Sequence, residues 1–128
     1  MSDQAVTKPA LWDKLGIGIS GMCALHCLAV PVVVALLPLW PAAEYLHDYT
    51  HPVFFLLILP TVIFAQRKSS GNRSVALFLY SGLLIVGLAW VLHEQLGPFG
   101  EAGVTLIGSL SLITGHLKNY RMHRRHSH

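Results

Sequence analysis

The sequence predicts an all-α integral membrane protein, a bundle of four transmembrane helices with both termini in the cytoplasm. Of its 128 residues, 53% are hydrophobic and only 12% are charged, which is outside the usual range of water-soluble domains. The hydrophobic residues also form four runs separated by charged or turn-forming stretches. We therefore expect one transmembrane domain that covers residues 1–128.

The first helix is expected over residues 13–39. Residues 15–39 contain no Asp, Glu, Lys or Arg, and this stretch is longer than the roughly 20 residues that a helix needs to cross hydrocarbon. It is also too long for the apolar core of a secretory signal, and three more apolar runs follow it. The segment is therefore expected to remain in the protein as a membrane span.

Three further helices are expected, over residues 44–66, 74–94 and 101–120. The apolar part of the second, residues 52–66, is short for a full crossing. Its helix is therefore expected to begin between Pro41 and Glu44, with the proline tolerated in the first turn. A basic turn at residues 67–73 precedes the third helix, and the Gly-Pro-Phe-Gly stretch at residues 97–100 precedes the fourth.

The basic residues predict the orientation in the membrane. All nine Lys and Arg residues precede the first helix, join the second to the third, or follow the fourth. The two opposite loops have no Lys or Arg and carry four acidic residues, Glu44, Asp48, Glu94 and Glu101. The positive-inside rule then places both termini in the cytoplasm. Since topology explains the net charge of +3, no nucleic-acid partner is expected.

Both cysteines lie in the first helix, in the stretch Gly-Met-Cys-Ala-Leu-His-Cys at residues 21–27. Helical spacing puts Cys23, His26 and Cys27 on one face, roughly 12 to 18 Å from the cytoplasmic end of the helix. Gly16 and Ser20 share this face and would let a neighbouring helix approach closely. The three side chains are therefore expected to point into the bundle at mid-membrane.

Thiolate and imidazole are the ligands that zinc, copper and softer ions select, and ionisable groups at mid-membrane usually mark function. We therefore expect a metal site, with packing cysteines and a hydrogen-bonded histidine as the alternative. A disulfide between residues four apart on a helix would be strained, although reversible oxidation remains open. Pro31 cannot donate to the carbonyl of Cys27, so that oxygen is expected as a further ligand.

The other candidate ligands lie towards the two membrane surfaces. An outer layer is expected from His47, Asp48, His51, His93 and Glu94, with a solvated loop as the alternative. Towards the cytoplasm, His116 shares a stripe with Thr105 and Ser109, and interhelical hydrogen bonding is its alternative role. The tail adds His123, His126 and His128, which we interpret mainly as part of a basic, topology-fixing end.

Ordered by depth, these groups are typical of a relay of partial ligand sets, which suits transport better than one closed four-ligand site. The sequence has no phosphate-binding glycine loop and no G-x-S-x-G elbow, so a transport protein is expected and not an enzyme. Its partners would be a metal ion and the lipid bilayer. Small residues also permit close packing within one chain or in a homodimer: Gly82, Gly87, Gly103 and Gly108.

Four short spans, the cysteine pair of the first, and the ending Gly-His-Leu-Lys-Asn-Tyr-Arg at residues 115–121 make the chain resemble the MerC mercuric-ion transport family. The resemblance covers nearly the whole chain. It implies a multi-pass protein of the bacterial inner membrane that carries mercuric ion inward, towards a cytoplasmic metal acceptor, with Cys23 and Cys27 as ligands. The divalent metal is then the transported substrate, and no organic cofactor is implied.

This chain departs from the mercury-operon pattern in its ligands. Its cysteine pair encloses His26, and its tail has histidines where those members carry a further cysteine pair. Because zinc accepts both thiolate and imidazole, the ligand set favours a zinc-like metal, whereas the resemblance implies mercury.

Two other functions remain open. A haem-binding electron carrier would use His51 and His93 as axial ligands, and Soret absorbance would detect it. A membrane thiol oxidoreductase is disfavoured, because it usually needs a Cys-x-x-Cys pair and a second pair to relay electrons.

Overall fold

The computed structural model describes residues 3–36, 41–69 and 71–126, with side chains for residues 11–29, 32, 48–69 and 71–125. The described residues form four α-helices and no β-strand. The helices are α1 (Asp3–Leu36), α2 (Pro41–Lys68), α3 (Arg73–Val91) and α4 (His93–His126). The all-helical class predicted from the sequence is confirmed.

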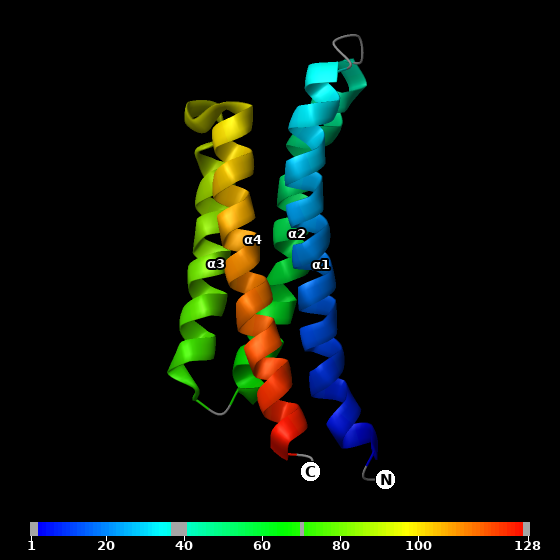
Figure 1. Cartoon of the computed structure of the whole chain (residues 1–128), viewed down its shortest axis with the longest axis vertical. Helices are drawn as coiled ribbons and strands as arrows, with labels where there is room; N and C mark the ends of the chain where they lie inside the picture. Colours follow the sequence, from blue (N-terminus) through cyan, green and yellow to red (C-terminus); the bar gives the residue numbers. More distant parts are fainter. Residues whose placement is uncertain (1–2, 37–40, 70, 127–128) are drawn as a thin grey trace.

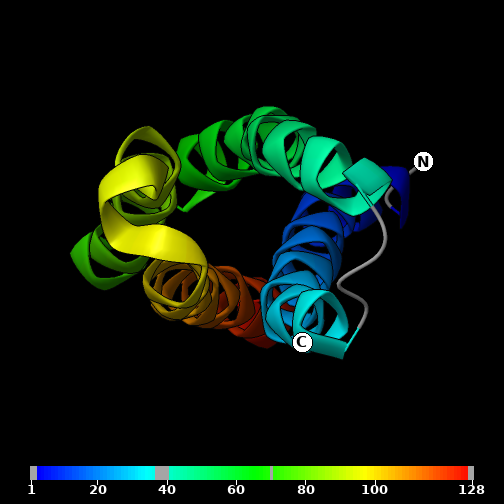
Figure 2. The same ribbon diagram turned by 90° about the horizontal axis from the view of Figure 1, so that it is seen from above.

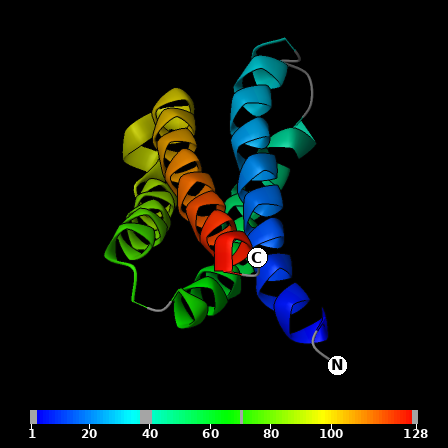
Figure 3. The same cartoon turned by 60° about the horizontal axis from the view of Figure 1, so that its bottom comes forward.

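The helices form an elongated bundle in which successive helices run in opposite directions (Figure 1). Seen from above, each helix lies beside the next one in the chain, and α4 closes the ring against α1 (Figure 2). The two termini lie at the same end of the bundle, where α2 ends and α3 begins (Figures 1 and 3). Two chain segments far apart in the sequence, α1 and α4, are thereby packed along their lengths.

Three segments of the described part are long and apolar enough to cross a membrane: Asp48–Lys68, Arg73–Val91 and His93–Arg125. A membrane crossing by α1 remains a prediction from the sequence. Large apolar side chains on the outside of the bundle are 62% to 69% exposed, a pattern that suits contact with lipid; they are Leu25, Leu56, Leu77, Leu84 and Ile107.

Several helix ends differ from those expected. α1 begins at Asp3 and α4 continues to His126; beyond the apolar run of α4, Arg121, Met122, Arg124 and Arg125 favour a helix. Between α3 and the main part of α4, Gly97 has the positive φ of 68°, and Pro98 follows in the first turn of the resumed helix. The Gly-Pro turn at residues 97–100 therefore lies within α4 as a sharp kink.

The apolar core lies mainly between α2, α3 and α4, and includes Ile58, Val62, Leu79, Val86 and Leu112. By contrast, the buried residues where α1 meets α4 are mostly polar. A buried polar surface inside a bundle that is apolar outside is the feature that positions the candidate site.

Candidate functional site

Two stripes of buried residues, one on α1 and one on α4, run through the bundle. Residues three and four apart lie on one side of a helix, so each stripe forms a continuous row. On α1 the row consists of Asp13, Gly16, Ser20, Cys23 and Cys27. On α4 it consists of Glu101, Thr105, Ser109, Leu112, His116 and Asn119. Since α1 and α4 pack against each other in opposite directions, the two rows form a polar interface along the bundle.

The thiols of Cys23 and Cys27 lie side by side towards the Glu101 end of this interface. Cys23 is 0% and Cys27 is 2% exposed, and both are free. The hydroxyl of Ser109 neighbours Cys23, and that of Thr105 neighbours Cys27. The two cysteines therefore face α4 inside the bundle. We call them the thiol pair.

His26 turns away from the thiol pair and towards α2. Its ring centroid lies 6.2 Å from that of His51 and 5.9 Å from that of Phe54. His51 in turn places its Nε2 3.4 Å from Oε1 of Glu101, with both side chains buried. The charge of Glu101 acts on Cys27, so this group lies next to the thiol pair. We call His26, His51 and Glu101 the His51 cluster.

The thiol pair and the His51 cluster are neighbours, but their side chains do not form a complete coordination sphere. Among the described residues, no three His, Cys, Asp or Glu side chains converge closely enough to hold a metal ion. The three ligands expected on one face of α1 thus do not lie together. His26 lies at the edge of that face, and its ring contacts the rings of His51 and Phe54 on α2. Binding all of them to one ion requires side-chain rotation.

The structure does not gather the rest of the expected outer layer. His93 is exposed, and its Nδ1 lies 2.7 Å from the carbonyl oxygen of Trp90 in its own turn. Glu94 and Asp48 are also exposed. Of the described members, only His51 is buried in the bundle. The side chain of His47 lies outside the described part, as do those of Pro31 and His126, and residue 128 as a whole.

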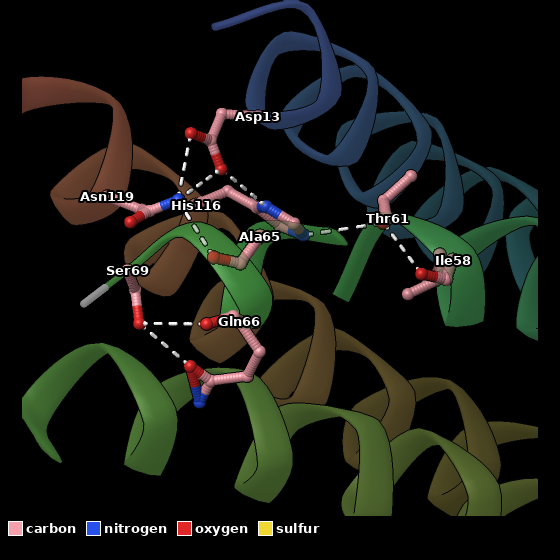
Figure 4. Close-up of polar contacts among 8 residues, drawn as sticks. All are labelled: Asp13, Ile58, Thr61, Ala65, Gln66, Ser69, His116 and Asn119. Carbon is pink, nitrogen blue, oxygen red and sulfur yellow. Dashed lines mark hydrogen bonds and ion pairs between the residues drawn. The ribbon is translucent and has the colours of Figure 1, made fainter. Parts of the chain in front are cut away.

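A second polar group, the His116 cluster, lies nearer the termini and joins three helices (Figure 4). Nδ1 of His116 lies 3.2 Å from Oδ1 of Asp13, and its Nε2 lies 3.5 Å from Oγ1 of Thr61. Nδ2 of Asn119 donates to both oxygens of Asp13 at 3.0 Å. These four side chains, which define the cluster, are at most 1% exposed.

The hydrogen bonds of the His116 cluster indicate how its protons are held. Thr61 donates its hydroxyl hydrogen to the carbonyl oxygen of Ile58 at 2.6 Å, so towards His116 it acts as an acceptor. An ionised Asp13 is also an acceptor only. Both contacts of His116 are then satisfied if it carries a hydrogen on each ring nitrogen, or if Asp13 holds the second one.

Gly16 allows His116 to pack directly against the backbone of α1. A Cβ atom at Gly16 would collide with Cε1, Nε2 and Cδ2 of the imidazole ring. The ring thus occupies the space that the side chain of any other residue at position 16 would need.

The sequence analysis missed three buried ionisable or amide groups, Asp13, Glu101 and Asn119. Glu101 precedes Thr105 by four residues, Asn119 follows His116 by three, and Asp13 precedes Gly16 by three. Extending the two small-residue and polar stripes by one helical turn at each end would have found all three.

Comparison with known proteins adds one finding. The family model for the MerC mercury resistance protein matches residues 13–121, which covers most of the chain. No curated protein and no solved structure matches. The matched region contains both cysteines and both polar clusters.

Proposed function

The chain belongs to the MerC family, and from that premise we propose that it transports a thiophilic divalent metal ion inward across the bacterial inner membrane. The thiol pair is the central station of this transport. The ion arrives through the His51 cluster, and a cytoplasmic acceptor receives it at the other end.

One observation carries this proposal: two free thiols lie side by side, fully buried, on a polar interface that runs along an otherwise apolar bundle. Packing alone does not account for it, because apolar residues would fill the interface at least as well. A row of hydroxyl, thiol, imidazole and carboxylate groups is instead the type of lining that lets a cation pass between weak sites.

The ligands around the thiol pair favour a zinc-like ion within a family associated with mercury. Mercuric ion is satisfied by two thiolates, whereas zinc prefers four ligands and accepts sulfur, nitrogen and oxygen together. The neighbouring His51 cluster offers imidazole and carboxylate on the same side of the bundle interior as the thiols, and the charge of Glu101 acts on Cys27. A haem carrier would instead need His51 and His93 as a ligand pair, and Soret absorbance of the purified protein distinguishes that alternative.

We further propose that all four helices cross the membrane and that the termini face the cytoplasm. The positive-inside rule supports this orientation, and the termini and the basic α2–α3 connection lie at one end of the bundle. Reporter tags at either terminus and at residue 70 should report the cytoplasm, whereas tags near residues 45 and 98 should report the periplasm. A periplasmic signal at residue 70 would contradict the orientation.

Uptake of metal into proteoliposomes tests the function directly. Wild-type protein should carry Zn²⁺ or Hg²⁺ faster than empty liposomes. In His51→Gln and Glu101→Gln, the half-saturating Zn²⁺ concentration should rise about tenfold or more, with less effect near saturation, because a capture ligand is lost.

The exposed His93 supplies a matched control, since His93→Gln removes a histidine near the same end of the bundle outside the His51 cluster. If the half-saturating Zn²⁺ concentration is the same in His51→Gln and His93→Gln, His51 does not capture the metal. Wild-type rates no higher than those of empty liposomes would contradict transport itself.

A further inference from the structure

We propose that the His116 cluster is a second cation site, for a divalent ion of the zinc class, which receives the metal from the thiol pair. The inference rests on the proposed function, because it names the next station on the same interface. It assigns a ligand role to Asp13 and Asn119, and it places His116 in a defined site with them.

The donor atoms of the cluster suit such an ion. Asp13 offers two carboxylate oxygens, and His116 offers Nδ1, which lies 3.2 Å from one of them (Figure 4). Oδ1 of Asn119 is buried and has no hydrogen-bond partner, so one more oxygen is already without a partner. Zinc binds imidazole nitrogen and carboxylate oxygen, usually with four ligands in all. A mercuric ion, which prefers thiolates, would bind this cluster more weakly than it binds Cys23 and Cys27.

A purely structural role explains the cluster poorly. Removing a carboxylate and an imidazole from water is costly, and well-packed apolar residues in their place are often as stabilising. The His116 ring also packs where a Cβ atom of residue 16 would lie, so this position requires glycine. Glycine has a low helix propensity, and the contact therefore costs local helix stability. Ionisable groups buried in a membrane bundle usually mark a functional site.

The interface connects the cluster to the thiol pair. Asp13 and Cys23 are ten residues apart on α1, which is roughly 15 Å along a helix. Between them lies Ser20, whose buried hydroxyl oxygen makes no hydrogen bond, and Ser109 of α4 presents its hydroxyl to Cys23. They offer a passing cation weak oxygen ligands. The sulfur ligands of the thiol pair then prefer softer metal ions, and the nitrogen and oxygen ligands of the His116 cluster prefer harder ones.

The test uses Co²⁺, which reports its ligands by absorption, on the full-length protein in detergent. In Cys23→Ser/Cys27→Ser, thiolate-to-cobalt charge transfer should vanish while ligand-field absorption of one bound Co²⁺ per chain remains, and Zn²⁺ should displace that ion. Adding Asp13→Asn or His116→Gln should weaken this remaining binding at least tenfold. His116→Gln is included because its amide can still hydrogen-bond to Asp13 and Thr61, which protects the fold.

Two matched controls exclude other sites in the same serine background. His123→Gln removes a histidine two turns further along α4, and Glu101→Gln removes the carboxylate of the His51 cluster. Both should retain the Asp13-dependent ion. Helix content by circular dichroism and elution as a single species establish that each variant is folded.

The outcomes separate this inference from the transport proposal. Co²⁺ binding that is absent in the double serine variant, or unaffected by both Asp13→Asn and His116→Gln, would overturn the second site and leave wild-type uptake standing. Asp13-dependent binding in a protein whose wild type gives no uptake would support the site and overturn transport.

Discussion

Replacing Cys23 or Cys27 by serine should weaken metal binding at least about 100-fold and reduce uptake to near that of empty liposomes. Loss of a group that only hydrogen-bonds to a metal ligand already costs roughly 10- to 100-fold in affinity, and a thiolate ligand contributes more. Serine keeps nearly the same volume at positions that are at most 2% exposed, so the packing of α1 against α4 should survive. Titration with Hg²⁺ and Zn²⁺ measures the binding.

Competition with protons gives this prediction a second measurement. A metal coordinates the thiolate and displaces the thiol proton, so wild-type binding should tighten as pH rises. Each single serine variant has one fewer thiol proton to displace, and its affinity should rise less steeply with pH.

Met22 provides a matched control, because it is 64% exposed on the outer face of α1 beside Cys23. Met22→Leu removes a sulfur from the same turn without touching the thiol pair, and it should bind and transport as the wild type does. If both serine variants behave like Met22→Leu at equal expression, the thiols are packing residues and the transport proposal loses its central site.

The contrast between Cys27 and His26 shows how far the sequence predicts the site. Helical periodicity predicts that Cys23 and Cys27 share a face with Gly16 and Ser20, and the structure buries that face against α4. It does not predict which neighbouring helix attracts a residue at the edge of the face, and His26 lies with His51 of α2. That choice depends on the register between helices, which no single segment encodes.

The same reason explains Asp13 and Glu101. In the sequence each stands near the end of an apolar run, where a charged side chain usually contacts water. In the structure each is buried and paired with a histidine from another helix, Asp13 with His116 and Glu101 with His51. A local pattern shows that a carboxylate lies on the inner face, but its partner becomes visible only when distant segments are packed together.

Close packing of α3 against α4 holds the α4 stripe in that register, and it depends on two glycines. A Cβ atom at Gly82 would lie 2.8 Å from the carbonyl oxygen of Gly108. One at Gly108 would lie 2.7 Å from Cγ2 of Val86 and 3.1 Å from the oxygen of Gly82. Backbone oxygens cannot rotate away as a flexible side chain can, so even a methyl group must push the helices apart.

Gly82→Ala and Gly108→Ala should therefore each lower the free energy of unfolding by about 1 to 3 kcal/mol, the usual effect of overpacking. This loss should appear although alanine has the higher helix propensity, by about 1 kcal/mol. Gly103 is the matched control on α4, because a Cβ atom there meets nothing within 4 Å. Gly103→Ala should leave stability unchanged or raise it by up to about 1 kcal/mol.

Denaturant titration in detergent micelles, followed by circular dichroism, measures the three alanine variants under one condition. The free energy of unfolding is expected to fall in Gly108→Ala and not in Gly103→Ala. Because both substitutions are made in the same helix, helix propensity cannot account for that difference. The displaced α4 should also weaken metal binding in Gly108→Ala, because α4 carries Glu101, Thr105 and Ser109 to the thiol pair. If Gly108→Ala is as stable as Gly103→Ala, α3 and α4 do not pack through their backbones, and the register that aligns the polar interface must come from α1 alone.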